Sequence, residues 1–78
     1  MNEILEYRYF TVYPEAIQPG RKTRDWRICA RNGGSPLGRI EWYSAWRQYV
    51  LVPDEMTLWS VDCLTDIADA IKKIKETP

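Results

Sequence analysis

The side chains best suited to recognition chemistry are concentrated in residues 40–53, IEWYSAWRQYVLVP. Two tryptophans, two tyrosines and Arg47 lie within these fourteen positions. Arginine and the large aromatic residues are the types enriched at the energetic centres of protein interfaces. They also suit a nucleic-acid surface, where arginine contacts phosphates or guanine edges and aromatic rings stack on bases. The stretch therefore predicts binding, to a protein or to a nucleic acid, and not bond-making chemistry.

Groups that could carry catalysis are few. The chain has no histidine to serve as a general base near neutral pH. Gly33-Gly34 lacks the Lys-Ser/Thr pair and the strand-to-helix setting of a phosphate loop. The adjacent acids Asp54-Glu55 follow Pro53, where we expect a loop with solvated carboxylates and no cleft across which they could converge. The sequence therefore predicts neither an enzyme nor a bound cofactor.

The cysteines and the N-terminal residues indicate the compartment. MNEILEYRYF shows no secretory signal, and no apolar run of the chain is long enough to span a bilayer. We therefore expect a cytoplasmic protein with no membrane partner, in which Cys29 and Cys63 are reduced and buried. Two cysteines without histidine lack the usual ligand set for zinc, so we expect no metal.

Four segments have the residue types and alternation of strands. They are residues 7–13, 25–31, 37–43 and 48–52. The second alternates cleanly, with Trp26 and Ile28 on one face and Arg27 on the other. Pro19-Gly20 in the connection 15–23 and the run NGGSP at 32–36 are turn signals. We expect the last two strands to form a hairpin that folds back at Ser44-Ala45.

A helix is predicted over residues 61–75. Ser60 has the side chain of an N-cap, and Asp62 lies in the first turn, where the helix dipole favours an anion. Isoleucines and a leucine recur three or four residues apart and give one apolar stripe. The acids come early in the helix and the lysines late, as expected for a solvated helix face.

These elements predict a single α+β domain over residues 1–78. Its sheet would be an antiparallel β-meander of three to four strands, covered on one face by the C-terminal helix. A chain this short buries a modest fraction of its surface, so large side chains must supply the core. We expect the core to contain Trp26, Ile28, Ile40, Trp42, Leu64, Ile67, Ile71 and Ile74.

The uncovered sheet face is the predicted binding surface. Residues 21–47 hold seven basic and two acidic groups, whereas residues 51–78 hold six acids and three lysines. A two-residue Ser-Ala turn is not a strongly specified type, so the hairpin register could slip by one residue. If the hairpin aromatics point outward, one partner-binding patch results. Its members would be Arg27, Arg39, Tyr43, Trp46, Arg47 and Tyr49.

One pattern in the chain carries a resemblance. LGRIEWYSAWRQYVLVP, followed after a short gap by CLTDIADAIKKI, resembles short uncharacterised proteins of phages and prophages. In that pattern an LG-x-I-x-WY…WR-x-Y hairpin precedes a Cys-Leu-x-x-Ile helix, and the match covers residues 37–74. The resemblance implies a phage or prophage context and no particular activity. In topology alone, a sheet followed by a helix is also similar to small three-stranded DNA-binding domains.

Two functions remain in competition. The first is a non-enzymatic protein-interaction module whose partner is another protein or a second copy of the chain. The alternative is a nucleic-acid-binding domain that uses the basic, aromatic sheet face of residues 21–49. The net charge of zero favours the first, because nucleic-acid-binding domains are commonly basic throughout.

Overall fold

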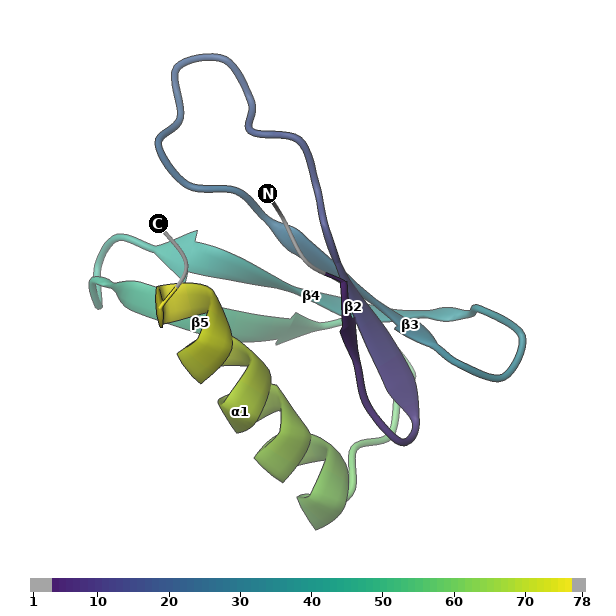
Figure 1. Cartoon of the computed structure of the whole chain (residues 1–78). Helices are drawn as coiled ribbons and strands as arrows, with labels where there is room; N and C mark the ends of the chain where they lie inside the picture. Colours follow the sequence, from purple (N-terminus) through teal and green to yellow (C-terminus); the bar gives the residue numbers. More distant parts are fainter. Residues whose placement is uncertain (1–3, 77–78) are drawn as a thin grey trace.

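In the computed structural model, which describes residues 4–76, five strands precede one helix (Figure 1). The elements are β1 (Leu5–Glu6), β2 (Phe10–Pro14), β3 (Trp26–Ala30), β4 (Pro36–Tyr43), β5 (Gln48–Pro53) and α1 (Val61–Glu76). The strands form one antiparallel sheet in the order β1-β2-β3-β4-β5, so each strand pairs with the next along the chain. Helix α1 packs against one face of this sheet. The predicted α+β arrangement is confirmed.

The helix begins where its capping residues require. The Ser60 hydroxyl oxygen accepts a hydrogen bond from the Cys63 backbone N–H at 3.1 Å, which satisfies one amide of the first turn. Asp62 lies in the first turn, and Lys73 and Lys75 lie in the last, so the charges complement the helix dipole. The predicted cap and start are confirmed, and the helix ends one residue later than expected.

The core lies between α1 and the sheet. Cross-strand pairing places Val12 opposite Ile28 and Trp26 opposite Ile40, so these side chains share the helix-facing side. The buried apolar residues are Phe10, Val12, Trp26, Ile28, Ile40, Ile67, Ala70 and Ile74. Burying one large apolar side chain contributes roughly 1.5–3 kcal/mol, so this cluster is the main source of stability.

Three of the predicted core positions lie at its margin: Leu64, Trp42 and Ile71, of which Ile71 is partly buried and packs against the core. Leu64 is 48% exposed, and its assignment to the core was wrong. At roughly 100° per residue, the stripe through Ile67, Ala70 and Ile74 leaves Leu64 on its outer flank. Trp42 faces the helix side, as expected, but is only half-buried.

The first predicted strand is divided. Tyr7 lies in the turn that joins β1 to β2, where its backbone N–H donates to the Phe10 carbonyl at 2.9 Å. The extra strand β1 then pairs Leu5 with Val12. The Tyr7 hydroxyl donates to Asp69 Oδ2 at 2.8 Å, which ties this turn to α1.

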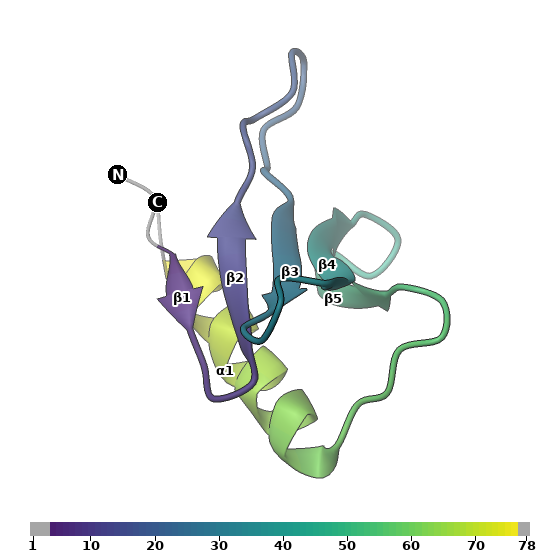
Figure 2. The same cartoon turned by 90° about the vertical axis from the view of Figure 1, so that its right-hand side faces the viewer.

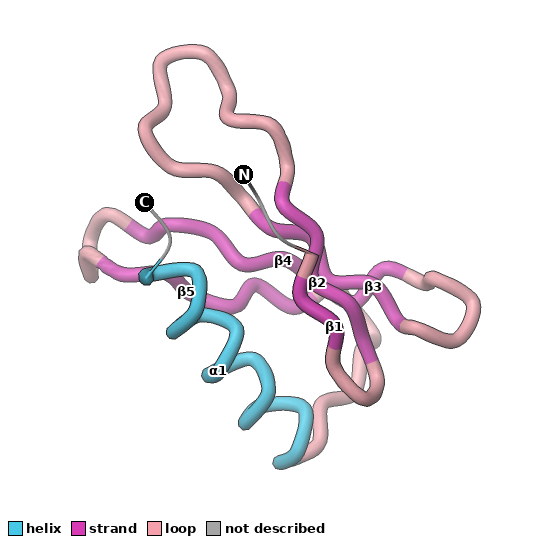
Figure 3. The backbone as a smooth tube through the Cα atoms, viewed as in Figure 1, coloured by secondary structure: helices cyan, strands magenta, loops and turns pink. Residues whose placement is uncertain are grey.

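Two longer connections lie outside the packed layers. The loop 15–25 between β2 and β3 projects from the sheet (Figures 2 and 3). Its base is closed by the Glu15 N–H, which donates to the Asp25 carbonyl at 2.9 Å. Near its tip, Gly20 adopts a φ of 81° after Pro19, as a type II turn requires. The NGGSP turn also forms, with the Ala30 N–H donating to the Ser35 carbonyl at 2.8 Å.

Candidate interaction surfaces

The β4–β5 hairpin has a longer turn than the sequence predicted. Tyr43 and Gln48 form its last cross-strand pair, so residues 44–47 make a four-residue connection in place of a two-residue turn. The Trp46 N–H donates to the Tyr43 carbonyl at 3.2 Å, and the Arg47 N–H donates to Ser44 at 3.1 Å. Arg47 closes the turn with a φ of 53°, in the left-handed region that glycine normally occupies.

This turn presents an exposed aromatic pair, Tyr43 and Trp46, next to Arg47; we call these three residues the hairpin tip. Trp46 is 65% exposed and Tyr43 is 45% exposed. Their ring centroids are 5.0 Å apart and their planes are perpendicular. Such an edge-to-face contact contributes about 0.5–1.5 kcal/mol beyond area burial, so the two rings hold each other in place. The pair belongs to no core and is available to a partner.

Tyr49 does not belong to this surface. It lies opposite Trp42 in the β4–β5 register, and the two rings meet edge-on with centroids 5.3 Å apart. Tyr49 packs against the core on the helix side of the sheet. The expectation that it faces outward beside Trp46 was wrong for a physical reason. Trp46 lies in the turn, whereas Tyr49 lies in β5 opposite Trp42, and directly opposed residues of two paired strands share one face of the sheet.

Arg27 and Arg39 lie directly opposite each other on the uncovered face. Each is bonded to a carboxylate. Arg27 Nε lies 3.1 Å from Glu15 Oε1, and Arg39 Nε lies 2.8 Å from Glu41 Oε2. The hydrogen bond to Glu41 raises the pKa of the Arg39 guanidinium above its ordinary value. These contacts offset the repulsion between two like charges placed across a strand pair.

The two arginines line a shallow hollow on this face. Its volume is about 100 Å³, and its lining residues are Glu15, Arg27, Pro36, Gly38, Arg39 and Asp54. Acids are therefore interspersed among the cations. Elsewhere in the basic stretch, Arg21 pairs with Asp25 at 3.3 Å and Arg31 with Glu6 at 3.9 Å. Four of the arginines in the basic N-terminal half therefore form ion pairs with carboxylates of the same chain.

A second apolar surface was missed by sequence reasoning. It consists of Met56, Leu58 and Val61, on the connection between β5 and α1 and the first helical residue; we call it the linker patch. These side chains are 98%, 95% and 79% exposed, respectively. Three highly exposed apolar side chains within six residues of the chain make this segment a candidate interaction site. The available signal was that Met56 and Leu58 belong to no strand and to no helical stripe.

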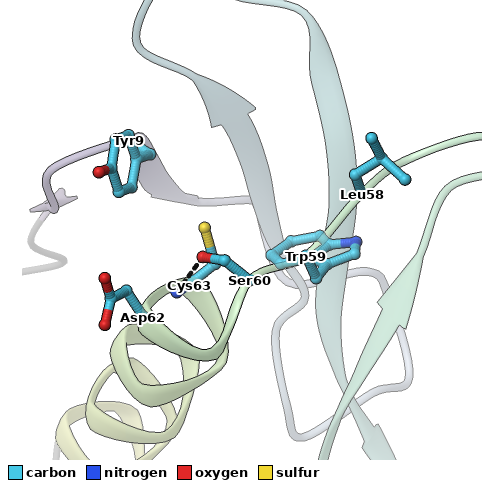
Figure 4. Close-up of a pocket in the computed structure, with 6 residues that line it drawn as sticks. All are labelled: Tyr9, Leu58, Trp59, Ser60, Asp62 and Cys63. Carbon is cyan, nitrogen blue, oxygen red and sulfur yellow. Dashed lines mark hydrogen bonds between the residues drawn. The ribbon is translucent and has the colours of Figure 1, made fainter.

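Trp59 explains why its neighbours are exposed. Its indole N–H donates to the Thr57 hydroxyl at 2.9 Å, and its ring meets Phe10 edge-on at 6.1 Å. The connection is thus anchored through Thr57 and Trp59, and the alternate residues Met56 and Leu58 turn to solvent. Beside it lies an open groove of about 550 Å³ (Figure 4). The groove is lined by Tyr9, Leu58, Trp59, Ser60, Asp62 and Cys63.

Residues 4–76 contain neither a cluster of metal-binding side chains nor a membrane-spanning helix. Within that range, no three side chains among His, Cys, Asp and Glu are grouped so that they could hold a metal ion. None of the helices in the same range combines the length and apolar character needed to cross a bilayer. Cys29 and Cys63 are free thiols, and both are half-buried where full burial was expected.

Comparison of the chain with protein-family models, with curated proteins and with solved structures gave no match. The function therefore has to be inferred from the surfaces that the fold itself presents.

Proposed function

We propose that the chain is a non-enzymatic protein-interaction module that binds its partner through the hairpin tip. The observation that carries this proposal is the perpendicular pair of Tyr43 and Trp46, exposed at the end of two paired strands. Tyrosine and tryptophan supply large contact area at low conformational-entropy cost, which suits them to interface centres. The resemblance to phage and prophage proteins supports a partner of host or phage origin, or a second copy of the chain.

The alternative, a nucleic-acid-binding domain over residues 21–49, has less support. Phosphate binding requires cations that can exchange counterions for phosphates. Arg27 and Arg39 are already bonded to Glu15 and Glu41, and the net charge is zero. A phosphate would have to displace these carboxylates and lie among them, so the protein-binding function is the better supported of the two.

The test is capture of a protein from a cell lysate by the tagged chain and by its Trp46→Ala variant, followed by identification and a measured Kd. Removing the ring of an interface centre costs at least about 2 kcal/mol, so the variant should bind roughly 30-fold or more weakly. Its free energy of unfolding should fall by no more than about 1.5 kcal/mol, because the ring loses little beyond its contact with Tyr43.

Ile17→Ala is the matched control, since Ile17 is exposed on the projecting loop, outside both apolar surfaces. Equal capture by wild type and Trp46→Ala, or unfolding of that variant, would contradict the proposal. Salt-sensitive binding to short DNA or RNA that is weakened by Arg27→Ala and not by Trp46→Ala would favour the nucleic-acid alternative.

A further inference from the structure

Strand β5 is an open edge of the sheet. It is the last strand in the order β1-β2-β3-β4-β5 and, among residues 4–76, pairs with no strand other than β4. The Asp54 N–H donates to the Leu37 carbonyl at 2.9 Å. Because hydrogen-bonded and non-bonded pairs alternate along antiparallel strands, Val52 and Val50 turn their amides toward β4. Tyr49 and Leu51 therefore turn their N–H and C=O groups outward.

Among residues 4–76, no other segment provides a backbone hydrogen bond to Tyr49 or Leu51. Edge strands in proteins are usually protected by charged side chains, by proline, by a bulge or by shortness. Pro53 ends β5, but residues 49–52 before it contain no charge and no proline, and their register with β4 is unbroken. The opposite edge of the sheet, β1, is only two residues long. The fold thus protects one edge and leaves the other available.

We propose that β5 pairs antiparallel with β5 of a second copy, across a two-fold axis at Val50. This inference rests on the proposed interaction function and identifies its partner as the chain itself. The axis at Val50 places Tyr49 opposite the partner's Leu51, so both outward residues find a donor and an acceptor. An axis at Leu51 would place Tyr49 opposite the partner's Pro53, which has no N–H to donate.

Charge at the two ends of β5 supports this register. Antiparallel pairing about Val50 places Arg47 opposite the partner's Pro53, beside the partner's Asp54 and the partner's Glu55. Arg47 forms no ion pair with a described residue of its own chain. In the dimer, the partner's Asp54 and the partner's Glu55 would face Arg47, and the two-fold symmetry would repeat this ion pair at the other end of the interface.

The exposed apolar surfaces support the same register. The turn that carries the hairpin tip precedes β5, and the connection that carries Met56 and Leu58 follows it, so these two connections leave opposite ends of the strand (Figure 1). A two-fold axis at the middle of β5 brings the start of one strand to the end of the other. The turn that carries Trp46 in one copy is then at the same end of the interface as the partner's connection from β5 to α1. One symmetric contact would therefore cover apolar side chains at both ends, as an isologous interface requires.

The test is the mass of the full chain by sedimentation equilibrium over a concentration series, with charged variants at the axis. The monomer mass is 9.2 kDa, and the wild type should approach twice that value with rising concentration. Val50→Lys should weaken self-association at least about tenfold, because it sets two lysines face to face across the axis. Val50→Glu should do the same. An equimolar mixture of the two variants should form a dimer again.

The matched control is Val52→Lys, which lies on the same strand and face but opposite the partner's Gln48, so it should weaken association less than Val50→Lys. The wild type gives a second measurement that needs no variant. Amide exchange at Tyr49 and Leu51 should slow as concentration rises, whereas exchange at Val50 should not depend on concentration.

A wild type that remains monomeric, or a dimer that the mixed Val50 variants do not restore, would overturn the inference. The proposed function has a separate outcome. A monomer whose capture of a different protein depends on Trp46 would overturn only the second-copy inference. A monomer without such capture would overturn both.

Discussion

Arg47 provides a test in which stability and binding should change in opposite directions. The residue closes the β4–β5 turn with a φ of 53°. The left-handed conformation costs a residue with a side chain roughly 1–2 kcal/mol, and glycine avoids that cost. Glycine also lowers the free energy of unfolding by about 0.5–1 kcal/mol, because it gives the unfolded chain more conformational freedom. Arg47→Gly should therefore raise the free energy of unfolding by about 0.5–1 kcal/mol.

Nothing in the native structure opposes this gain. The Arg47 side chain is exposed and forms no ion pair with a described residue, so its removal costs no such contact. Urea denaturation followed by tryptophan fluorescence measures the change, because the Trp26 ring is buried and reports unfolding. With a slope near 1 kcal/mol per molar urea, the midpoint should rise by roughly 0.5–1 M.

Arg47→Ala is the matched control, since it removes the same guanidinium and keeps the positive φ. It should leave the midpoint almost unchanged. Both variants should weaken self-association to a similar degree, because both lose the cation that faces the partner's carboxylates. A gain in stability that appears equally in both variants, or in neither, would refute the reasoning about backbone strain. An arginine at a strained position is what a binding role at the cost of stability would produce.

Two further predictions concern the sheet and its contact with the helix. Gly38→Ala should lower the free energy of unfolding by about 1–3 kcal/mol, because its Cβ would lie 2.6 Å from the Val52 carbonyl oxygen; a loss of only a few tenths in urea denaturation would contradict this. Burial, and then the hydrogen bond to Asp69, raise the pKa of the Tyr7 hydroxyl. Above pH of about 10 the unfolded chain releases this proton while the folded chain retains it, so stability falls as pH rises. Tyr7→Phe should cost about 0.5–1.5 kcal/mol at pH 7 and show a shallower alkaline decline, and equal declines in both proteins would contradict this assignment.

The features that sequence reasoning predicted correctly are those fixed by near neighbours. The Ser60 cap, the helix start and the burial of Ile67 and Ile74 depend on residues within one or two helical turns. The loop signals at Pro19-Gly20 and at residues 32–36 are equally local. In each case one short-range rule decides the outcome, and the tertiary structure does not compete with it.

The errors arise where distant pairing decides. Tyr49 faces the helix because a four-residue turn sets the register with Trp42, and that turn depends on Arg47 in a conformation that its residue type does not signal. Phe10 is fully buried, yet its segment gave no face preference until β1 and β3 supplied partners. The linker patch was missed for the same reason. Only the contact between Trp59 and Phe10 shows which residues of that connection face outward.

The distribution of unsatisfied groups connects the two proposals. On the uncovered face, Arg27 and Arg39 each have a carboxylate partner. In the core the apolar side chains pack against one another, and the buried Trp26 indole N–H has no hydrogen-bond partner among the described residues. The most exposed of the large apolar side chains lie instead between residues 46 and 61. The outward amides of β5 lie in the same segment, as does the guanidinium of Arg47, which forms no ion pair with any of residues 4–76. A chain selected only for stability as a monomer would gain from polar residues in place of the exposed apolar ones and from glycine at position 47. Their concentration around one strand is therefore best explained by a partner that pairs with β5 and covers both of its ends.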